Sequence, residues 1–208
     1  GSTLNTRQYA TKGYLEKLIA QVFTGRERFE PGNPQEGYSP SPQERQSWLQ
    51  ISYMKEAYHT MGPKFTLGWM AEALYSSKNF SENYTATMMQ AGEFAPTPHS
   101  KLMYNEAFRA NQYVAAGIKP IYVLNDMFQF RTEFYGFTPI FPIKKNALNK
   151  AYYGKAFSRF EYMGEVSVIC HLPFGAISAY VNHYSSPRRE WNVGMTIGWQ
   201  LFNYRFVE

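Results

Sequence analysis

The chain has 208 residues, of which 44% are hydrophobic but only 18% are charged, and its formal net charge is +5. No run approaches the roughly 20 apolar residues of a membrane-spanning helix, and aromatic and β-branched residues are too frequent for a disordered chain, so both classes are excluded. The single cysteine, Cys170, excludes an internal disulfide and a cysteine-based zinc site, and the dispersed basic residues form no patch that would predict nucleic-acid binding.

The chain begins with a short stretch that carries no strand pattern. Gly1 and Ser2 resemble a remnant of a cloning vector, so we expect residues 1–8 to be such a remnant or a linker. The natural N-terminus is then expected to lie upstream. The remaining residues show no composition break, so we expect one β-domain over residues 1–208.

Eight segments alternate between apolar and polar residues with the period of two that is typical of β-strands. In chain order they are 14–24, 48–59, 65–75, 112–124, 127–137, 159–172, 176–184 and 191–201. The last is the clearest, because Trp191, Ile197 and Trp199 fall on a wholly apolar face opposite small and polar residues. In the first segment the pattern does not settle which positions share a face.

The connections between these segments alternate in length. Short turns are expected at 60–64, 125–126 and 173–175, and longer connections at 25–47, 76–111, 138–155 and 185–190. Outer-membrane barrels have this pattern, with short periplasmic turns and longer external loops. We therefore predict an all-β fold, an antiparallel up-and-down transmembrane β-barrel with eight strands in this chain.

Alternation alone does not show which face points inward, so a soluble eight-stranded ligand-binding barrel is the alternative. Aromatic residues near strand ends and opposite charges on the polar faces favour the membrane barrel, although the same charges would suit a solvated sheet face. The residues predicted to pair ionically in the lumen are Glu72, Lys119, Arg131, Glu133, Arg159, Glu161 and Glu165. Those predicted to face lipid are Trp69, Phe128, Phe130, Phe134, Trp191, Ile197 and Trp199.

The connection 76–111 lacks alternation, and loops of this length are usually functional or disordered. It ends in Phe108, Arg109, Ala110 and Asn111, and five predicted strands follow it.

Several stretches together resemble the C-terminal barrel region of Bacteroidota patatin-like phospholipases, over most of residues 45–208. They are Asn83 to Thr87, Phe94 to Ser100, Phe108 to Gln112, Ala115 to Pro120, Arg131 to Tyr135 and Gly198 to Phe202. Proteins of that family join a patatin lipase domain to a barrel of the bacterial surface antigen (BamA-like) superfamily, with about sixteen strands.

The resemblance implies that this chain is the C-terminal half of such a barrel in the outer membrane of a Gram-negative bacterium. It also implies two partners, outer-membrane lipid and a missing N-terminal lipase domain of the same protein. A half-barrel has open edges, which allow a homodimer as well.

The superfamily carries a Val/Ile-Arg-Gly-Phe/Tyr motif that ends its sixth external loop and folds back into the lumen. Phe108, Arg109, Ala110 and Asn111 resemble that motif, with Ala110 and Asn111 in place of the glycine and the aromatic residue. The resemblance implies that Arg109 meets an acidic residue of the lumen wall, and Glu133 and Glu161 are the candidates.

The sequence predicts no catalytic residue in this chain. A patatin lipase needs a Gly-x-Ser-x-Gly elbow, and none occurs here. A small outer-membrane lipid hydrolase remains an alternative, for which His171, His183, Ser178 and Ser185 are the available groups. The four histidines show no metal-ligand spacing, so we predict no metal and no cofactor.

Overall fold

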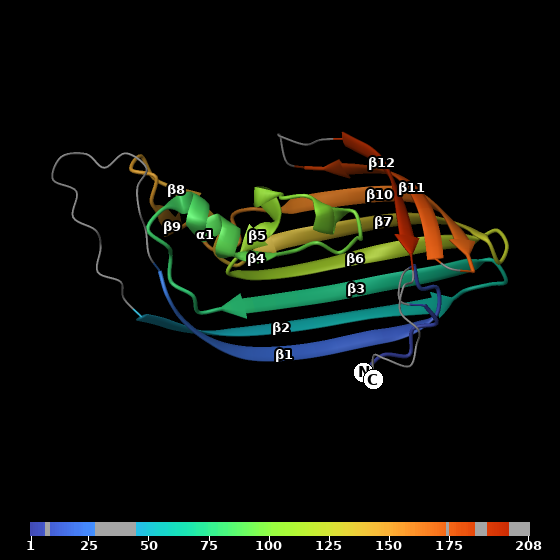
Figure 1. The fold of residues 1–208 in the computed structure, drawn as a ribbon, viewed down its shortest axis with the longest axis horizontal. Helices are drawn as coiled ribbons and strands as arrows, with labels where there is room; N and C mark the ends of the chain where they lie inside the picture. The colour runs from blue at the N-terminus through green and yellow to red at the C-terminus, as the bar shows by residue number, and fades with distance from the viewer. Residues whose placement is uncertain (7–8, 28–44, 174, 186–190, 200–208) are drawn as a thin grey trace.

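Eight strands form a single antiparallel sheet in which each strand pairs with its neighbours along the chain (Figure 1). The computed structural model describes residues 1–6, 9–27, 45–173, 175–185 and 191–199. The strands are β1 (Gly13–Arg26), β2 (Arg45–Thr60), β3 (Phe65–Ser76), β6 (Gln112–Val123), β7 (Phe128–Pro139), β10 (Glu161–Leu172), β11 (Gly175–Tyr184) and β12 (Trp191–Trp199). Each lies on one predicted segment, so the eight strands and their up-and-down order are confirmed.

Parts of some predicted elements lie outside the described residues. These parts are 7–8 of the N-terminal stretch, 28–44 and 186–190 of two loops, Phe174 of a turn, and 200–201 of the last strand.

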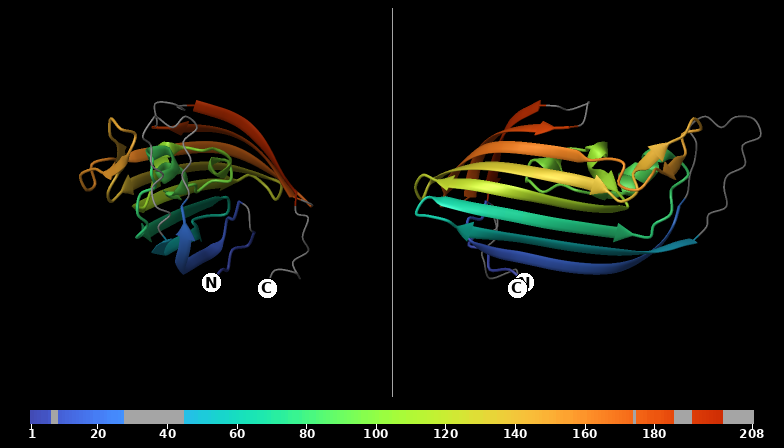
Figure 2. Two further views of the ribbon diagram at one scale, coloured as in Figure 1. Left: turned by 60° about the vertical axis from the view of Figure 1, so that its left-hand side comes forward. Right: turned by 180° about the vertical axis from the view of Figure 1, so that it is seen from behind.

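The sheet is an open, curved trough and not a closed eight-stranded barrel (Figure 2). Within the described residues β1 and β12 are its two edges and do not pair with each other. The turns 61–64 and 124–127 lie at one end of the trough, and the elements of two long connections lie toward the other end (Figure 1). In one turn the Asn125 side chain accepts hydrogen bonds from the N–H groups of Met127 and Phe128, a local bond that favours tight turns.

The long connections contain regular structure that alternation could not predict. Between β3 and β6 lie α1 (Tyr84–Gln90), a small hairpin of β4 (Gly92–Glu93) and β5 (Arg109–Ala110), and two 3-10 turns, Ser100–Leu102 and Glu106–Phe108. In the connection between β7 and β10, strands β8 (Ile143–Lys145) and β9 (Ala151–Tyr153) pair with each other. The Asn83 side chain caps α1 by accepting a bond from the N–H of Ala86 at 2.8 Å. In the part of the chain that is described, no helix has the length and apolar character to cross a membrane.

The sheet exposes an apolar face, and its buried face carries both charged and apolar side chains. On one side of β7, Arg131 and Glu133 are 3% and 6% exposed. On the other side, Phe130 and Phe134 are 43% and 53% exposed. The buried side is the concave face of the trough, where the elements of the connection 77–111 pack (Figures 1 and 2). The sheet therefore exposes large apolar side chains on its convex face, which a soluble sheet would hide.

Three tyrosine rings on the concave face each cover a glycine directly across the sheet. The pairs are Tyr58 with Gly68, Tyr135 with Gly117, and Tyr180 with Gly194. A Cβ atom added at any of these glycines would lie closer than 3 Å to its tyrosine ring. The glycines thus leave room for the rings to lie flat on the sheet, as aromatic side chains do when they cover a strand glycine.

The replacement Gly117→Ala is expected to lower the free energy of unfolding by about 1–3 kcal/mol, as overpacking usually does. The new Cβ would lie 2.2 Å from the Tyr135 ring and 2.7 Å from the backbone oxygen of Phe134, which cannot swing away. Urea unfolding of the chain folded in detergent micelles measures the change. The matched control is Gly164→Ala on β10, where the nearest atom would be 3.5 Å away and little change is expected. Equal effects of the two replacements would contradict this account of the glycine.

Candidate functional site

The concave face carries a buried network of opposite charges. Lys119 lies 3.0 Å from Glu56, and Arg131 lies 3.0 Å from Glu133, with both cations almost fully buried. The Tyr135 hydroxyl donates to Glu133 at 2.6 Å. Buried charges are tolerated when they are paired and hydrogen-bonded, and each of these is.

The seven residues predicted as lumen ionic partners lie on this side of the sheet or against its contents. Arg131 pairs with Glu133, and Arg159 lies 3.7 Å from Glu161. The other three have partners that the sequence analysis did not single out. Lys119 pairs with Glu56, Glu72 accepts a bond from the Tyr113 hydroxyl, and Glu165 contacts His99. Glu56 could have been found, because the alternation of its strand places it on the polar face.

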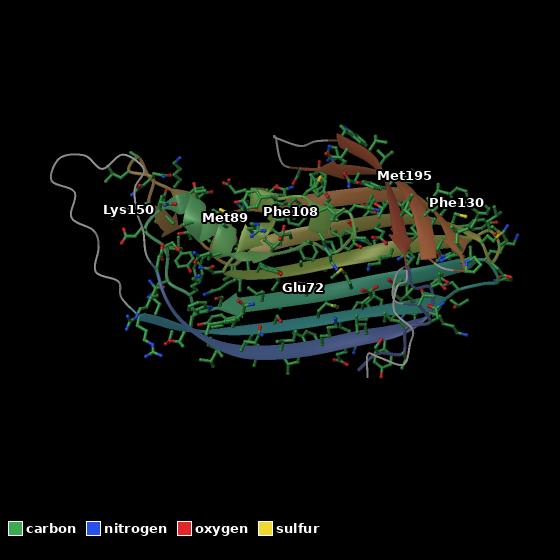
Figure 3. All side chains as sticks on the ribbon, in the orientation of Figure 1. Glu72, Met89, Phe108, Phe130, Lys150 and Met195 are labelled. Carbon is green, nitrogen blue, oxygen red and sulfur yellow. The ribbon has the colours of Figure 1, made fainter. Side chains whose placement is uncertain are left out.

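A folded segment fills part of the trough; we call residues 94–108 the inner loop. Phe94 and Phe108, at its two ends, are each 2% exposed. Phe94 stacks on Phe137 with ring centroids 5.9 Å apart, and Phe108 packs edge-on against Tyr184 at 5.8 Å. Figure 3 shows Phe108 on the inner side of the sheet. Aromatic contacts of this kind hold both ends of the inner loop on the sheet.

The predicted partner of Arg109 is wrong. Arg109 binds Glu93 at 2.6 Å, and neither Glu133 nor Glu161. The reason is that Glu93 and Arg109 are directly paired between β4 and β5 at the base of the inner loop, so their side chains meet without reaching the wall.

Arg109 also closes the end of a helix. Its guanidinium donates to the carbonyls of Met89 and Ala91, at 3.1 and 3.2 Å, where the last carbonyls of α1 lack helical partners. A cation near a helix C-terminus also interacts favourably with the helix dipole. Arg109 therefore organises the loop internally.

The rest of the predicted motif is buried at the base of the loop. Phe108 packs as described, and Ala110 is fully buried and pairs with Gly92. The Asn111 amide donates to the Lys78 carbonyl at 3.3 Å and to the Tyr153 hydroxyl at 3.0 Å. The motif thus joins the connection 77–111 to the β8–β9 connection.

A cavity of about 690 Å³ lies between the inner loop, the N-terminal residues and the sheet. Charges of both signs line it, among them Glu72, Lys101, Lys119 and Glu133. Tyr9 reaches its border from the N-terminal segment, and burial raises the pKa of the Tyr9 hydroxyl, which stays protonated and able to donate near neutral pH. The mixed lining favours water and ions over an apolar ligand.

Beside the cavity, three polar side chains from distant parts of the chain meet. His99 of the inner loop lies 2.8 Å from Glu165 through Nδ1 and 3.2 Å from the Ser178 hydroxyl through Nε2. Their order resembles that of a serine hydrolase triad. Ser178 is among the groups that the sequence offers for a hydrolase, but no sequence signal points to His99. It lies 66 positions from Glu165 and 79 positions from Ser178 in the chain, and no local spacing links residues so far apart.

The pair that the sequence offered for a hydrolase does not form. His183 stacks on Tyr162 at 5.8 Å, whereas the Ser185 hydroxyl donates to Glu161. His171 is partly exposed at the end of β10.

The residues predicted to face lipid lie on the convex side wherever they are described. Phe128, Phe130 and Phe134 are 38–53% exposed, Trp191 and Ile197 are 68% and 60% exposed, and Trp69 is partly exposed. The Trp199 side chain lies outside the described residues.

Among the residues that the structure describes, no group of three or more His, Cys, Asp or Glu side chains is placed to hold a metal ion. Comparison with protein-family models, curated proteins and solved structures finds no match.

Proposed function

We propose that this chain is half of an outer-membrane β-barrel that anchors or translocates an associated patatin-like lipase domain and carries no catalysis of its own. The observation that supports a location in the membrane is the placement of side chains on the sheet, with charges on the buried concave face and apolar side chains exposed on the convex face. Arg131 and Glu133 are buried on β7, while Phe130 and Phe134 on the same strand face outward.

The convex side presents large apolar residues on neighbouring strands. On β6, β7 and β10 the exposed members are Val114, Ile118, Tyr122, Phe128, Phe130, Phe134, Tyr162, Val166 and Val168. Soluble monomers rarely expose continuous apolar patches of this kind, which mark protein or membrane contact. A soluble ligand-binding barrel would place these side chains in its interior, so the exposed patch argues against that alternative.

The strand lengths suit a bilayer. Strands β6, β7 and β10 have 12 residues each. A tilted strand needs about 9–11 residues to cross the hydrocarbon core. Each of these strands is therefore long enough to cross the hydrocarbon core.

The contents of the trough favour a barrel larger than eight strands. The interior of an eight-stranded barrel has room for side chains or for one small ligand, whereas this concave face holds the folded inner loop in addition to a cavity of about 690 Å³. Within the described residues no strand of the sheet lies outside β1 or β12, and residues 1–3 cover only the start of the β1 edge. Because the eight strands alternate in direction, β1 and β12 run antiparallel to each other. Further strands from the same protein, or from a second copy, would continue the pattern at both edges.

The link to a lipase domain rests on the family resemblance of residues 45–208. The resemblance supports a location in the outer membrane of a Gram-negative bacterium and outer-membrane lipid as a partner. The absence of a Gly-x-Ser-x-Gly elbow from the sequence supports the assignment of any lipase chemistry to another domain.

Refolding tests the membrane assignment. The unfolded chain is diluted into lipid vesicles or into buffer alone, and the products are separated by flotation and by gel migration with and without heating. We expect the chain to float with the vesicles, to migrate differently after heating, and to precipitate in buffer alone. A chain that stays soluble and monomeric without lipid or detergent would overturn the proposal.

A further inference from the structure

The contact of Glu165, His99 and Ser178 ties the inner loop to the wall of the trough. All three side chains are at most 3% exposed. Glu165 lies on β10 and Ser178 on β11, so His99 bridges two strands from a loop far away in sequence. The Asn182 amide lies 3.4 Å from the other oxygen of Glu165 and orients the carboxylate.

The local structure fixes His99 in its place. Thr97 and Ser100 exchange hydrogen bonds on either side of it, which makes a rigid turn. The His99 ring stacks on Tyr180 with centroids 3.5 Å apart. Tyr180 in turn covers Gly194, so the loop, the aromatic ring and the sheet lie in three layers.

The opposite side of the same turn borders the cavity. Ala95, Pro96, Pro98, Lys101 and Leu102 line the cavity, whereas His99 points to the wall. A displacement of this turn would therefore change the free space in the trough.

We propose that the inner loop gates the lumen and that His99 holds this loop in place. Its bonds to Glu165 and Ser178, which we call the pin, keep the inner loop against the wall and thereby set the open cross-section of the lumen. This inference rests on the proposed function, because a lumen exists only if the trough is part of a barrel. The pin itself is a feature of the trough and can be tested without the membrane.

The alternative for these residues is acyl transfer by Ser178. The geometry argues against it, because the Ser178 hydroxyl is enclosed by the Tyr9 hydroxyl at 2.8 Å and by His99 at 3.2 Å. Ser178 is 1% exposed, so an ester carbonyl has no approach to its oxygen. A nucleophile needs such access as well as a base.

Hydrogen–deuterium exchange of the full chain, folded in detergent micelles, tests the pin. His99→Ala is expected to raise the exchange rates of backbone amides in residues 94–108 by about tenfold or more, while those of β2 and β3 stay unchanged. The matched control is His183→Ala, which removes a histidine stacked on the convex side and leaves the inner loop as it was. If His99→Ala does not fold, Glu165→Gln keeps the side-chain shape, weakens the bond to Nδ1, and is expected to raise the same rates by a smaller factor.

Unchanged exchange in residues 94–108 of both variants would overturn the pin. So would labelling of Ser178 by a fluorophosphonate probe in the wild type that disappears in Ser178→Ala, because an accessible nucleophile contradicts the enclosed hydroxyl. In planar bilayers, where two copies of the chain can close a barrel at their edges, His99→Ala is expected to raise the pore conductance above that of His183→Ala, and equal conductance of the two pores would overturn the gate. If the wild-type chain does not insert at all, the proposed function fails, but the exchange measurement still decides the pin.

Discussion

Replacing Glu133 with alanine is expected to lower the free energy of unfolding by about 3–5 kcal/mol, because Arg131 would be left as a buried cation without its carboxylate. Arg131 is 3% exposed and its Nε lies 3.0 Å from Glu133. Its other bonds, from Nη1 to the Ala10 carbonyl at 2.9 Å and from Nη2 to the Tyr58 hydroxyl at 3.4 Å, supply no opposite charge. Urea unfolding of the chain in micelles measures the loss.

Two control variants separate the charge from the packing. The double replacement Arg131→Met with Glu133→Leu removes both charges and is expected to recover most of the stability lost in Glu133→Ala, since apolar pairs often replace buried ion pairs without loss. Glu16→Ala removes one partner of an exposed pair, Glu16 and Lys55 at 3.8 Å, and a much smaller loss is expected because water and salt screen this pair. An equally large loss in Glu16→Ala, or a double variant no better than the single one, would contradict a buried network.

Replacing Phe134 with arginine on the convex side is expected to destabilise the chain in a bilayer by about 2–4 kcal/mol, the cost of an arginine facing the middle of the membrane. In water the same change would be harmless or favourable, because Phe134 is 53% exposed. The sign of the effect therefore distinguishes lipid from water at this face. Equilibrium unfolding by guanidinium of the chain inserted in thin lipid vesicles measures it.

The matched control for this charge is Phe157→Arg. Phe157 is 62% exposed and lies in the connection between β9 and β10, outside the sheet strands. An arginine there is expected to cost less than about 1 kcal/mol, as near the membrane interface. Equal costs at both positions would mean that Phe134 does not face the hydrocarbon core.

The strands and their faces could be predicted because both depend on neighbouring residues. A period of two is visible within one segment, and the side of Arg131 and Glu133 follows from it directly. The first strand shows the limit of this rule. Leu18 and Ile19 lie next to each other on opposite faces of β1 and are both exposed at the open edge, so its sequence carries no clear alternation.

The contacts of the long connection could not be predicted, because they depend on how the chain returns to the sheet. Arg109 meets Glu93 because the two-residue strands β4 and β5 pair at the base of the inner loop, a pairing too short for alternation to reveal. His99 reaches Glu165 and Ser178 only after the sheet has brought β10 and β11 together. The open trough is likewise a property of the assembled strands, since each strand has the same alternation of apolar and polar residues in an open sheet and in a closed barrel.

The most direct test of the account asks which side of β7 contacts lipid. Single cysteines at Phe130 and Gln129, in a Cys170→Ser background, carry a fluorescent label in the chain inserted in vesicles. We expect a quencher dissolved in the lipid to quench the label at position 130, which replaces a 43% exposed phenylalanine, and to spare the label at position 129, which replaces a 2% exposed glutamine. Quenching of both labels by a water-soluble quencher, with no effect of the lipid quencher on position 130, would contradict the membrane assignment.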